Sequence, residues 1–266
     1  MQCSITTPFQ AKALICKRIW TAKLFLAAVL SCGTISHAVA QQQEIAPQAH
    51  PASQLLQYQA KYFITRQGER HGEAQRSLAQ LEDGTYKLSY RSDIEWMIFS
   101  DERTESSRFA YHDGDVKPLD YVLEREGTGP DKTYKVSFEH DAQQVFTNKS
   151  KYPIEIEWKA DFQDVLSYQI ALRKGLANGE TKFAYPIVDK KGNSREYMFE
   201  VVGTEAITLP IGNVETIIVK RLYDSDKRQA IAWFAPSMNY MMVRMFKGKD
   251  GVEQFVVELA EYTPLQ

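Results

Sequence analysis

The most regular feature of this chain is an alternation of apolar and polar residues that begins at Tyr58. From Tyr58 to Ile64 every second side chain is apolar, which is the pattern of a strand with one buried face. Comparable segments follow at short intervals, separated by turn sequences such as the Asp-Gly pairs at 83–84 and 113–114. The pattern therefore predicts antiparallel strands joined by short turns, with a longer hairpin loop at 247–251.

One segment, residues 161–174, has helical rather than strand periodicity. Asp161 is placed to cap its first turn, and Gly175 is placed to end it. Its apolar residues recur at helical spacing and form one face: Phe162, Val165, Leu166 and Leu172. We therefore expect a single helix here and strands in the rest of the β-rich part.

About a dozen strands and one helix predict a mainly β protein at the border of the α+β class. We expect a large curved antiparallel sheet, or an open half-barrel, whose concave face is covered by the helix near residues 161–174. A fully closed barrel is the alternative. Residues 57–266 are expected to form a single β-rich domain, with an apolar space between the helix and the sheet.

The first forty residues have the composition of an export leader. Basic residues at its start are followed by an apolar run at 24–30 and by the small-x-small sequence Ala38-Val39-Ala40. We expect a signal peptide at 1–40, cleavage after Ala40, a flexible lead-in at 41–56 and a periplasmic location. The alternative is a lipoprotein anchored at Cys32. Because the apolar run is shorter than the about 20 residues that span a bilayer, no transmembrane span is expected after signal removal.

Cleavage after Ala40 would remove all three cysteines, which stand at positions 3, 16 and 32. The exported chain would then contain no disulfide and no thiol chemistry. It would keep 28 basic residues against 34 acidic ones, a net charge of −6. A nucleic-acid-binding domain is normally basic, so this charge argues against nucleic acid as a partner.

The sequence offers no catalytic constellation, and we expect neither a metal nor a cofactor. None of the four histidines that follow the leader is paired at the spacing of metal ligands: His50, His71, His112 and His140. Aromatic and methionine-rich strands near the C-terminus are instead suited to line an apolar ligand. The candidate ligand-lining residues, from these strands and the helix, are Phe162, Leu166, Trp233, Phe234, Tyr240 and Met242.

Two motifs resemble an uncharacterised bacterial family of exported proteins, domain of unknown function 3108. The first is the helical segment with Asp164, Ser167, Tyr168 and Arg173, and the second is the block Trp-Phe-Ala-Pro at 233–236 with its flanking strands. The resemblance covers roughly residues 58–262. It implies an exported, mainly β protein without an established activity. The polar residues that it singles out are Asp164, Ser167, Arg173, Arg221 and Arg244.

Three hypotheses about function follow. The leading one is an exported envelope protein, not an enzyme, that binds an apolar or amphipathic ligand such as a lipid or acyl chain. Each buried methylene contributes about 0.8 kcal/mol, so such a ligand needs no specific polar contact. The second is a structural protein that docks on another envelope component. The third is an envelope-polymer hydrolase that would use Asp164, Ser167 and Arg173.

Overall fold

The computed structural model describes residues 55–265 except 97–98, 149–153 and 155. The expected signal peptide, its cleavage site after Ala40, Cys32 and nearly all of the lead-in lie outside these residues. The described part is mainly β and forms one antiparallel sheet of thirteen strands with one α-helix. The predicted fold class, a curved sheet with a covering helix, is confirmed.

The strands form two meanders. The first contains β1 (Tyr58–Arg66), β2 (Glu69–Gln80), β3 (Tyr86–Trp96), β4 (Phe99–His112), β5 (Asp115–Gly127), β6 (Lys132–Glu139) and β7 (Gln144–Thr147). The second contains β8 (Lys182–Val188), β9 (Ser194–Leu209), β10 (Gly212–Leu222), β11 (Arg228–Ala235), β12 (Met241–Lys249) and β13 (Val252–Pro264). Helix α1 (Tyr168–Ala177) lies between the meanders in sequence, and a short 3₁₀ turn, η1 (Pro236–Met238), precedes β12.

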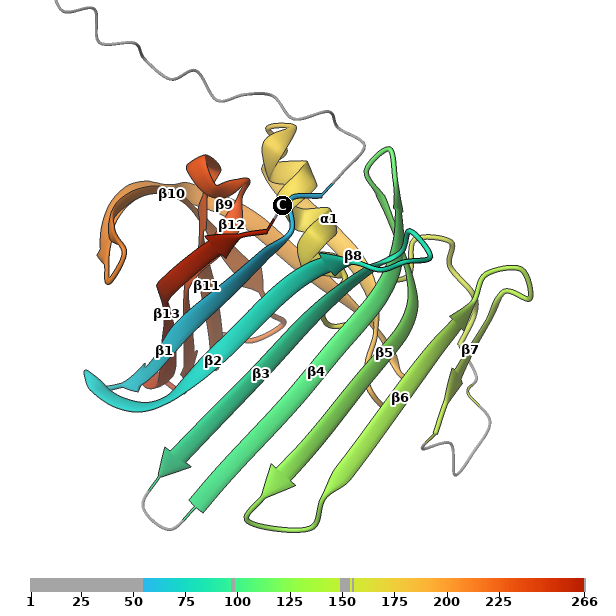
Figure 1. Ribbon diagram of the computed structural model, residues 1–266, viewed down its shortest axis with the longest axis horizontal. Helices are drawn as coiled ribbons and strands as arrows, with labels where there is room; N and C mark the ends of the chain where they lie inside the picture. Colours follow the sequence, from blue (N-terminus) through green and yellow to red (C-terminus); the bar gives the residue numbers. More distant parts are fainter. Residues whose placement is uncertain (1–54, 97–98, 149–153, 155, 266) are drawn as a thin grey trace, which may run out of the picture. The chain divides into compact units, whose positions relative to one another are not determined.

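The first and last strands join the two meanders into one sheet. β1 pairs antiparallel with β13, from Tyr58 opposite Pro264 to Thr65 opposite Val256. The strand order is therefore β7-β6-β5-β4-β3-β2-β1-β13-β12-β11-β10-β9-β8. Within the described residues, β7 and β8 are the two edges of the sheet and do not pair with each other, so the alternative of a closed barrel is wrong. Figure 1 shows the sheet curving so that β1 to β6 lie in front of β8 to β12.

Two-residue turns connect several strands. The pairs at 67–68, 113–114 and 250–251 all have positive φ at both positions, as in the hairpin turns whose twist suits antiparallel strands. The predicted hairpin loop at 247–251 is wrong in length, because β12 continues to Lys249 and only Asp250 and Gly251 form the turn.

The described residues just before α1, 156–167, pack against the concave side of the sheet and contact its β8 edge. Gln163 pairs with this edge, because its backbone N–H donates to Pro186 O at 2.9 Å and its carbonyl accepts from Val188 N at 2.8 Å. The Gln163 side chain donates to Val116 O of β5 at 2.7 Å. One residue therefore connects the β8 edge to a strand of the other meander.

The helix is present where the sequence predicts one, but it starts and ends later. It covers Tyr168–Ala177 instead of 161–174, and Asp161 is exposed and does not cap it. Gly175 does not end the helix either. It is buried in the third turn, where a Cβ atom would lie 2.6 Å from Cε1 of Phe183. Gly175 is thus explained by the close approach of α1 to β8.

The core consists of two clusters, one on each side of α1. The larger joins the strands of both meanders to the helix, and its largest fully buried residues include Tyr58, Tyr62, Leu88, Phe109, Ile170 and Leu259. The smaller packs the other face of the helix on β8 to β11 and contains Leu172, Leu176, Phe183, Phe199, Val219 and Phe234. Helix α1 is therefore fixed between the two halves of the curved sheet.

Candidate functional site

The interior of the curved sheet contains a cavity of about 780 Å³. Strands from both meanders form its walls, and α1 with the turn before it closes one end. The residues of this end that face the space are Val165, Leu166, Tyr168, Gln169 and Leu172. Tyr168 stacks on Phe199 of β9 with ring centroids 5.4 Å apart, so the helix is firmly attached to the wall. We call this end the floor of the cavity.

The floor is mostly apolar, with Gln169 as its polar residue. Beside the helical residues it includes Phe234 of β11 and Met242 of β12, both of which belong to or pack against the smaller core cluster. Met242 also accepts, through its carbonyl, a hydrogen bond from the Tyr62 hydroxyl at 2.9 Å. The floor is therefore a rigid surface made mainly of aliphatic, aromatic and thioether groups.

Polarity rises along the same strands with distance from the helix. On β9 the inward residues change from Phe199 through Tyr197 to Arg195, and on β10 Val219 is followed by Arg221. Four residues of a strand span about 13 Å. Arg195 therefore lies far from the helix, whereas Arg221 lies directly opposite Phe199 in the ladder, and we call the far end at Arg195 the rim.

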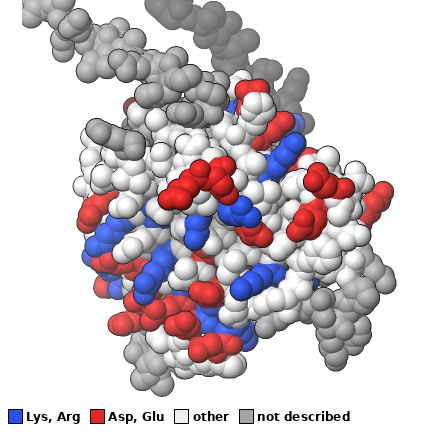
Figure 2. Space-filling model, turned by 45° about the vertical axis from the view of Figure 1, so that its right-hand side comes forward, with Lys and Arg blue, Asp and Glu red and all other residues white. Residues whose placement is uncertain are grey.

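The charge that lines the cavity is predominantly positive. The lining contains eight cationic residues against three acidic ones. The cations are Arg66, Arg76, Arg103, Lys190, Lys191, Arg195, Arg221 and Lys247, and the acids are Asp101, Glu105 and Asp189. The chain as a whole has a formal charge of −2. On the face shown in Figure 2, acidic and basic side chains are interspersed.

Three of these cations line the cavity from strands of both meanders. Lys247 projects from β12, Arg221 from β10 and Arg103 from β4. Burial within the protein lowers the pKa of Lys247, the charges of Arg221 and Arg103 lower it further, and Glu105 opposes them. Lys247 is nevertheless accessible to water, because it faces the cavity. The four side chains therefore share one interior space.

Arg221 is held by aromatic rings rather than by a carboxylate. Its guanidinium carbon lies 3.3 Å from the ring centroid of Tyr197 and 4.6 Å from that of Tyr223. The Nε atom of Arg221 is buried and has no hydrogen-bond partner among the described residues. Arg103 differs, because its Nη2 lies 2.6 Å from Asp101. Asp101 is shared, since Nε of Arg125 also lies 2.7 Å from it.

A buried arginine also lies close to the floor. Arg76 of β2 is only 6% exposed, and its Nη1 donates to the side-chain oxygen of Gln169 on α1 at 2.7 Å. Nearby tyrosines stabilise its cation, and they raise its pKa despite the opposing effect of burial. The Nε atom of Arg76 has no hydrogen-bond partner among the described residues. The inner part of the cavity is thus also electropositive.

Asp164 and Ser167 form a reciprocal cap before the helix. Oδ1 of Asp164 accepts from the backbone N–H groups of Leu166 and Ser167 at 2.7 and 2.9 Å, and Oγ of Ser167 accepts from Asp164 N at 2.9 Å. The other carboxylate oxygen accepts from Oγ of Ser107 on β4 at 2.6 Å. Burial raises the pKa of Asp164 to about 6, although these hydrogen bonds lower it. This arrangement attaches the start of the helix to β4.

The other polar residues of the family motif lie apart from this cap. Arg173 points to the turn before β12, where its Nε and Nη2 donate to Asn239 O at 3.1 and 2.9 Å. Arg244 lies 3.3 Å from Glu258 and over the ring of Trp233. Of the five motif residues, only Arg221 lines the cavity. Asp164, Ser167 and Arg173 do not converge on one position, as a hydrolase site would require.

The candidate ligand-lining residues divide into two groups. Leu166, Phe234 and Met242 line the cavity. Phe162 is 1% exposed and packs edge-on against Trp158 in the core. Trp233 lies beside Glu205, to which its Nε1 donates, and Tyr240 belongs to the turn before β12, where it has positive φ. The structure thus brings three of the six together around the cavity.

The sequence pattern missed Arg103, Glu105 and Lys247. Arg103 and Glu105 lie in a segment that is polar on both faces and that the alternation did not assign to a strand. Lys247 was placed in the hairpin loop that the structure shows to be part of β12. Residues separated by an even number of positions on a strand point to the same side of the sheet. Glu105 and Arg103 lie two and four residues before the buried Ser107, and Lys247 lies four residues after the buried Val243, so this spacing could have placed them on the inner face.

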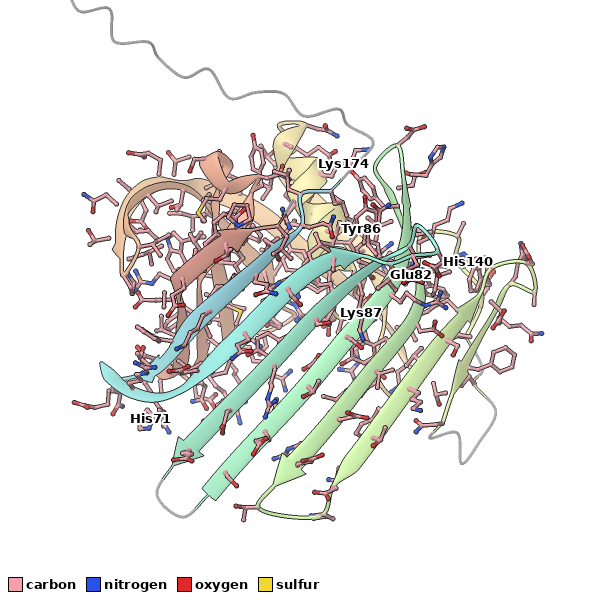
Figure 3. All side chains as sticks on the ribbon, in the orientation of Figure 1. His71, Glu82, Tyr86, Lys87, His140 and Lys174 are labelled. Atoms are coloured by element: carbon pink, nitrogen blue, oxygen red, sulfur yellow. The ribbon has the colours of Figure 1, made fainter. Side chains whose placement is uncertain are left out.

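The histidines of the described residues do not gather into a site, and His50 lies outside those residues. Figure 3 shows His71 at the start of β2 and His140 after β6, on opposite sides of the molecule. A ring nitrogen of His140 lies 2.7 Å from Pro118 O, and the ring packs edge-on against Trp158. No group of three His, Cys, Asp or Glu residues within the described chain could hold a metal ion.

The fold and the cavity define a class of protein: an open, barrel-like antiparallel sheet that surrounds a helix and a water-accessible interior. A solved structure with this architecture is the beta-barrel-like protein of domain of unknown function DUF1849 from Brucella abortus. It matches with a TM-score of 0.54 and 10% identity, over 80% of this chain and 100% of that chain. This likeness shows the fold alone.

The chain belongs to the family described as "Protein of unknown function (DUF3108)", whose sequence profile matches residues 57–257. The resemblance drawn from the two motifs is therefore confirmed. A more distant structure, a candidate exported protein with a YmcC-like fold from Bacteroides fragilis, matches with a TM-score of 0.32 and 13% identity over 79% of this chain and 97% of that chain. No curated protein matches the sequence. In the part of the chain that the structure describes, no helix has the length and apolarity needed to cross a membrane.

Proposed function

We propose that this chain is an exported envelope protein that binds an amphipathic ligand with an acyl chain, without chemical turnover. The observation that carries the proposal is the cavity of about 780 Å³ between the sheet and α1, with an apolar floor and a charged rim. Ligand sites commonly occupy about 300–1,000 Å³ and are lined by apolar groups with a few polar ones. The leader at 1–40 supports a periplasmic location, with Cys32 as an alternative lipid anchor.

The binding energy would come mainly from the acyl chain. About ten buried methylenes contribute roughly 8 kcal/mol before the costs of immobilising the ligand are subtracted. The methionines at the floor and on β12, Met242 and Met245, can adapt to chains of different shape. The site is therefore suited to bind one class of lipid rather than a single rigid molecule.

Filling the cavity should abolish this binding. We expect Met245→Trp to weaken the affinity for a fluorescent dodecanoate analogue at least tenfold, because the indole would occupy space beside the floor. The matched control is Val202→Trp, which adds the same ring at a position that is 51% exposed. Fluorescence titration measures both affinities, and native mass spectrometry of protein purified from the envelope tests for a retained lipid. A wild-type protein that neither retains lipid nor binds the analogue would refute the proposal.

A second candidate function is docking on another envelope protein through the edge strand β7. Among the described residues β7 pairs only with β6, and its Phe146 is 51% exposed. An unpaired edge beside an exposed aromatic residue can accept a strand from a partner. A photo-crosslinking amino acid at Phe146 should then give one dominant adduct in cells, whereas the same group at Val202 should not. Absence of an adduct at Phe146 would exclude this edge as the contact.

A further inference from the structure

We propose that the ligand carries an anionic headgroup, a carboxylate or a phosphate, which Arg221, Lys247 and Arg103 bind while the acyl chain extends toward the floor. This inference rests on the proposed function, because it names the chemical class of the ligand for the same cavity. The occupant is a lipid rather than a free anion, since the cations adjoin an apolar space large enough for a chain.

The first support is the unbalanced charge of the three residues. No ion pair of Arg221 or Lys247 with a carboxylate occurs in the described part of the chain, and their ring contacts are with tyrosines and Phe255. Asp101 carries one negative charge and pairs with two arginines, Arg103 and Arg125, so one of the two positive charges is not balanced by it. Glu105 accepts a hydrogen bond from the Tyr121 hydroxyl at 2.8 Å. A positive excess therefore remains in the space between these walls.

The second support is the orientation of Arg221. A guanidinium stacked on aromatic faces keeps its N–H donors in its own plane, and those donors match the oxygens of a carboxylate or phosphate. Tyr197 and Tyr223 hold the guanidinium in this way, and the buried Nε still lacks a protein acceptor. Such a preorganised donor would lose little side-chain entropy when an anion binds.

The third support is the direction of polarity. Arg221 lies two residues from Val219, which packs on α1, and Lys247 lies two residues from Met245 on the cavity wall. A headgroup at these cations would therefore place its chain along Met245 toward Phe234 and Leu166. An anionic amphipath matches both ends, whereas a neutral lipid would leave the cations without a counter-charge.

The test compares four ligands at one ionic strength and below their micelle concentrations: dodecanoate, dodecyl phosphate, dodecanol and inorganic phosphate. We expect the two anionic amphipaths to bind at least tenfold more tightly than dodecanol, and millimolar inorganic phosphate not to displace them. Arg221→Gln and Lys247→Gln should each weaken the anionic ligands at least fivefold and leave dodecanol unchanged. The matched controls are Lys220→Gln on β10 and Lys249→Gln on β12, whose side chains are exposed and do not line the cavity.

The outcomes separate this inference from the proposed function. Equal affinity for dodecanoate and dodecanol would refute the anionic headgroup while the acyl site stands. No binding of any amphipath would refute the proposed function itself. Displacement of both anionic amphipaths by inorganic phosphate would show a site for a free anion and overturn the inference. Circular dichroism verifies folding, and if Arg221→Gln is unfolded, Lys247→Gln decides the result alone.

Discussion

Replacing Asp164 with alanine is expected to lower the free energy of unfolding by about 3 kcal/mol at pH 5. The substitution removes the side-chain cap of the turn that leads into α1, which contributes about 1 kcal/mol, and leaves buried donors without an acceptor at about 1–3 kcal/mol. The donors are the backbone N–H groups of Leu166 and Ser167 and the hydroxyl of Ser107. Urea denaturation followed by circular dichroism measures the loss.

The size of this loss should depend on pH. Burial raises the pKa of Asp164 from 3.8 to about 6, so between about pH 4 and pH 6 the folded protein binds more protons at this residue than the unfolded chain does. The stabilising contribution is complete below pH 4 and is lost as the pH rises through 6. Two pKa units correspond to about 3 kcal/mol over the whole transition, and about half of it lies between pH 5 and pH 8, so Asp164→Ala should be less destabilising at pH 8 by about 1.5 kcal/mol.

The control is Asp161→Ala, three residues earlier. Asp161 is exposed, so this substitution should change the free energy of unfolding by less than about 0.5 kcal/mol at either pH. An equal loss for Asp164→Ala at pH 5 and pH 8 would show that protonation of this carboxyl is not linked to folding.

The strands were predictable because most of them have one buried and one solvated face. In β1 the residues Tyr58, Ala60, Tyr62 and Ile64 are buried, and the alternation appears directly in the sequence. The turn at 113–114 was predictable because its Asp-Gly pair provides the two positive φ angles that a two-residue hairpin needs, whereas at 83–84 only Gly84 has a positive φ. Strand alternation and turn residues both depend only on neighbouring positions in the chain, so they can be recognised from a single sequence.

The pairing of β1 with β13 could not be read in the same way, because it joins residues about two hundred positions apart and depends on the complete curved sheet. The charged part of the cavity was missed for another reason. Arg103 and Glu105 face inward but toward water, so the strand that carries them is polar on both faces. A pattern that equates the inner face with apolar residues cannot detect a wet interior.

The helix start was misassigned because two aspartates precede it at similar positions. Asp161 precedes the apolar periodicity directly, but Asp164 binds both Ser167 and Ser107 and so fixes the turn that precedes the helix, which itself begins at Tyr168. Gly175 was read as a stop, although it is a site of close packing against Phe183. The sequence alone does not distinguish Asp161 from Asp164 at the start of the helix, or a helix stop from a packing site at Gly175. In both cases a contact with another strand determines the outcome.

Replacing Phe162 with alanine is expected to lower the free energy of unfolding by about 3–5 kcal/mol, the usual cost of truncating a fully buried phenylalanine. Phe162 is 1% exposed, and its ring centroid lies 5.8 Å from that of Trp158. Urea denaturation followed by tryptophan fluorescence measures the loss. Phe146→Ala is the control, because Phe146 is half exposed and its truncation should cost much less.

The same variant distinguishes a core residue from a ligand contact. Phe162 does not line the cavity, whereas Leu166, four residues later, does. We therefore expect folded Phe162→Ala to bind dodecanoate with unchanged affinity, and Leu166→Ala to bind it more weakly, when both are measured well below their unfolding transitions. A tenfold loss of affinity in Phe162→Ala without a loss of stability would reverse this assignment. It would place the acyl chain beyond the floor, between the turn before α1 and Trp158.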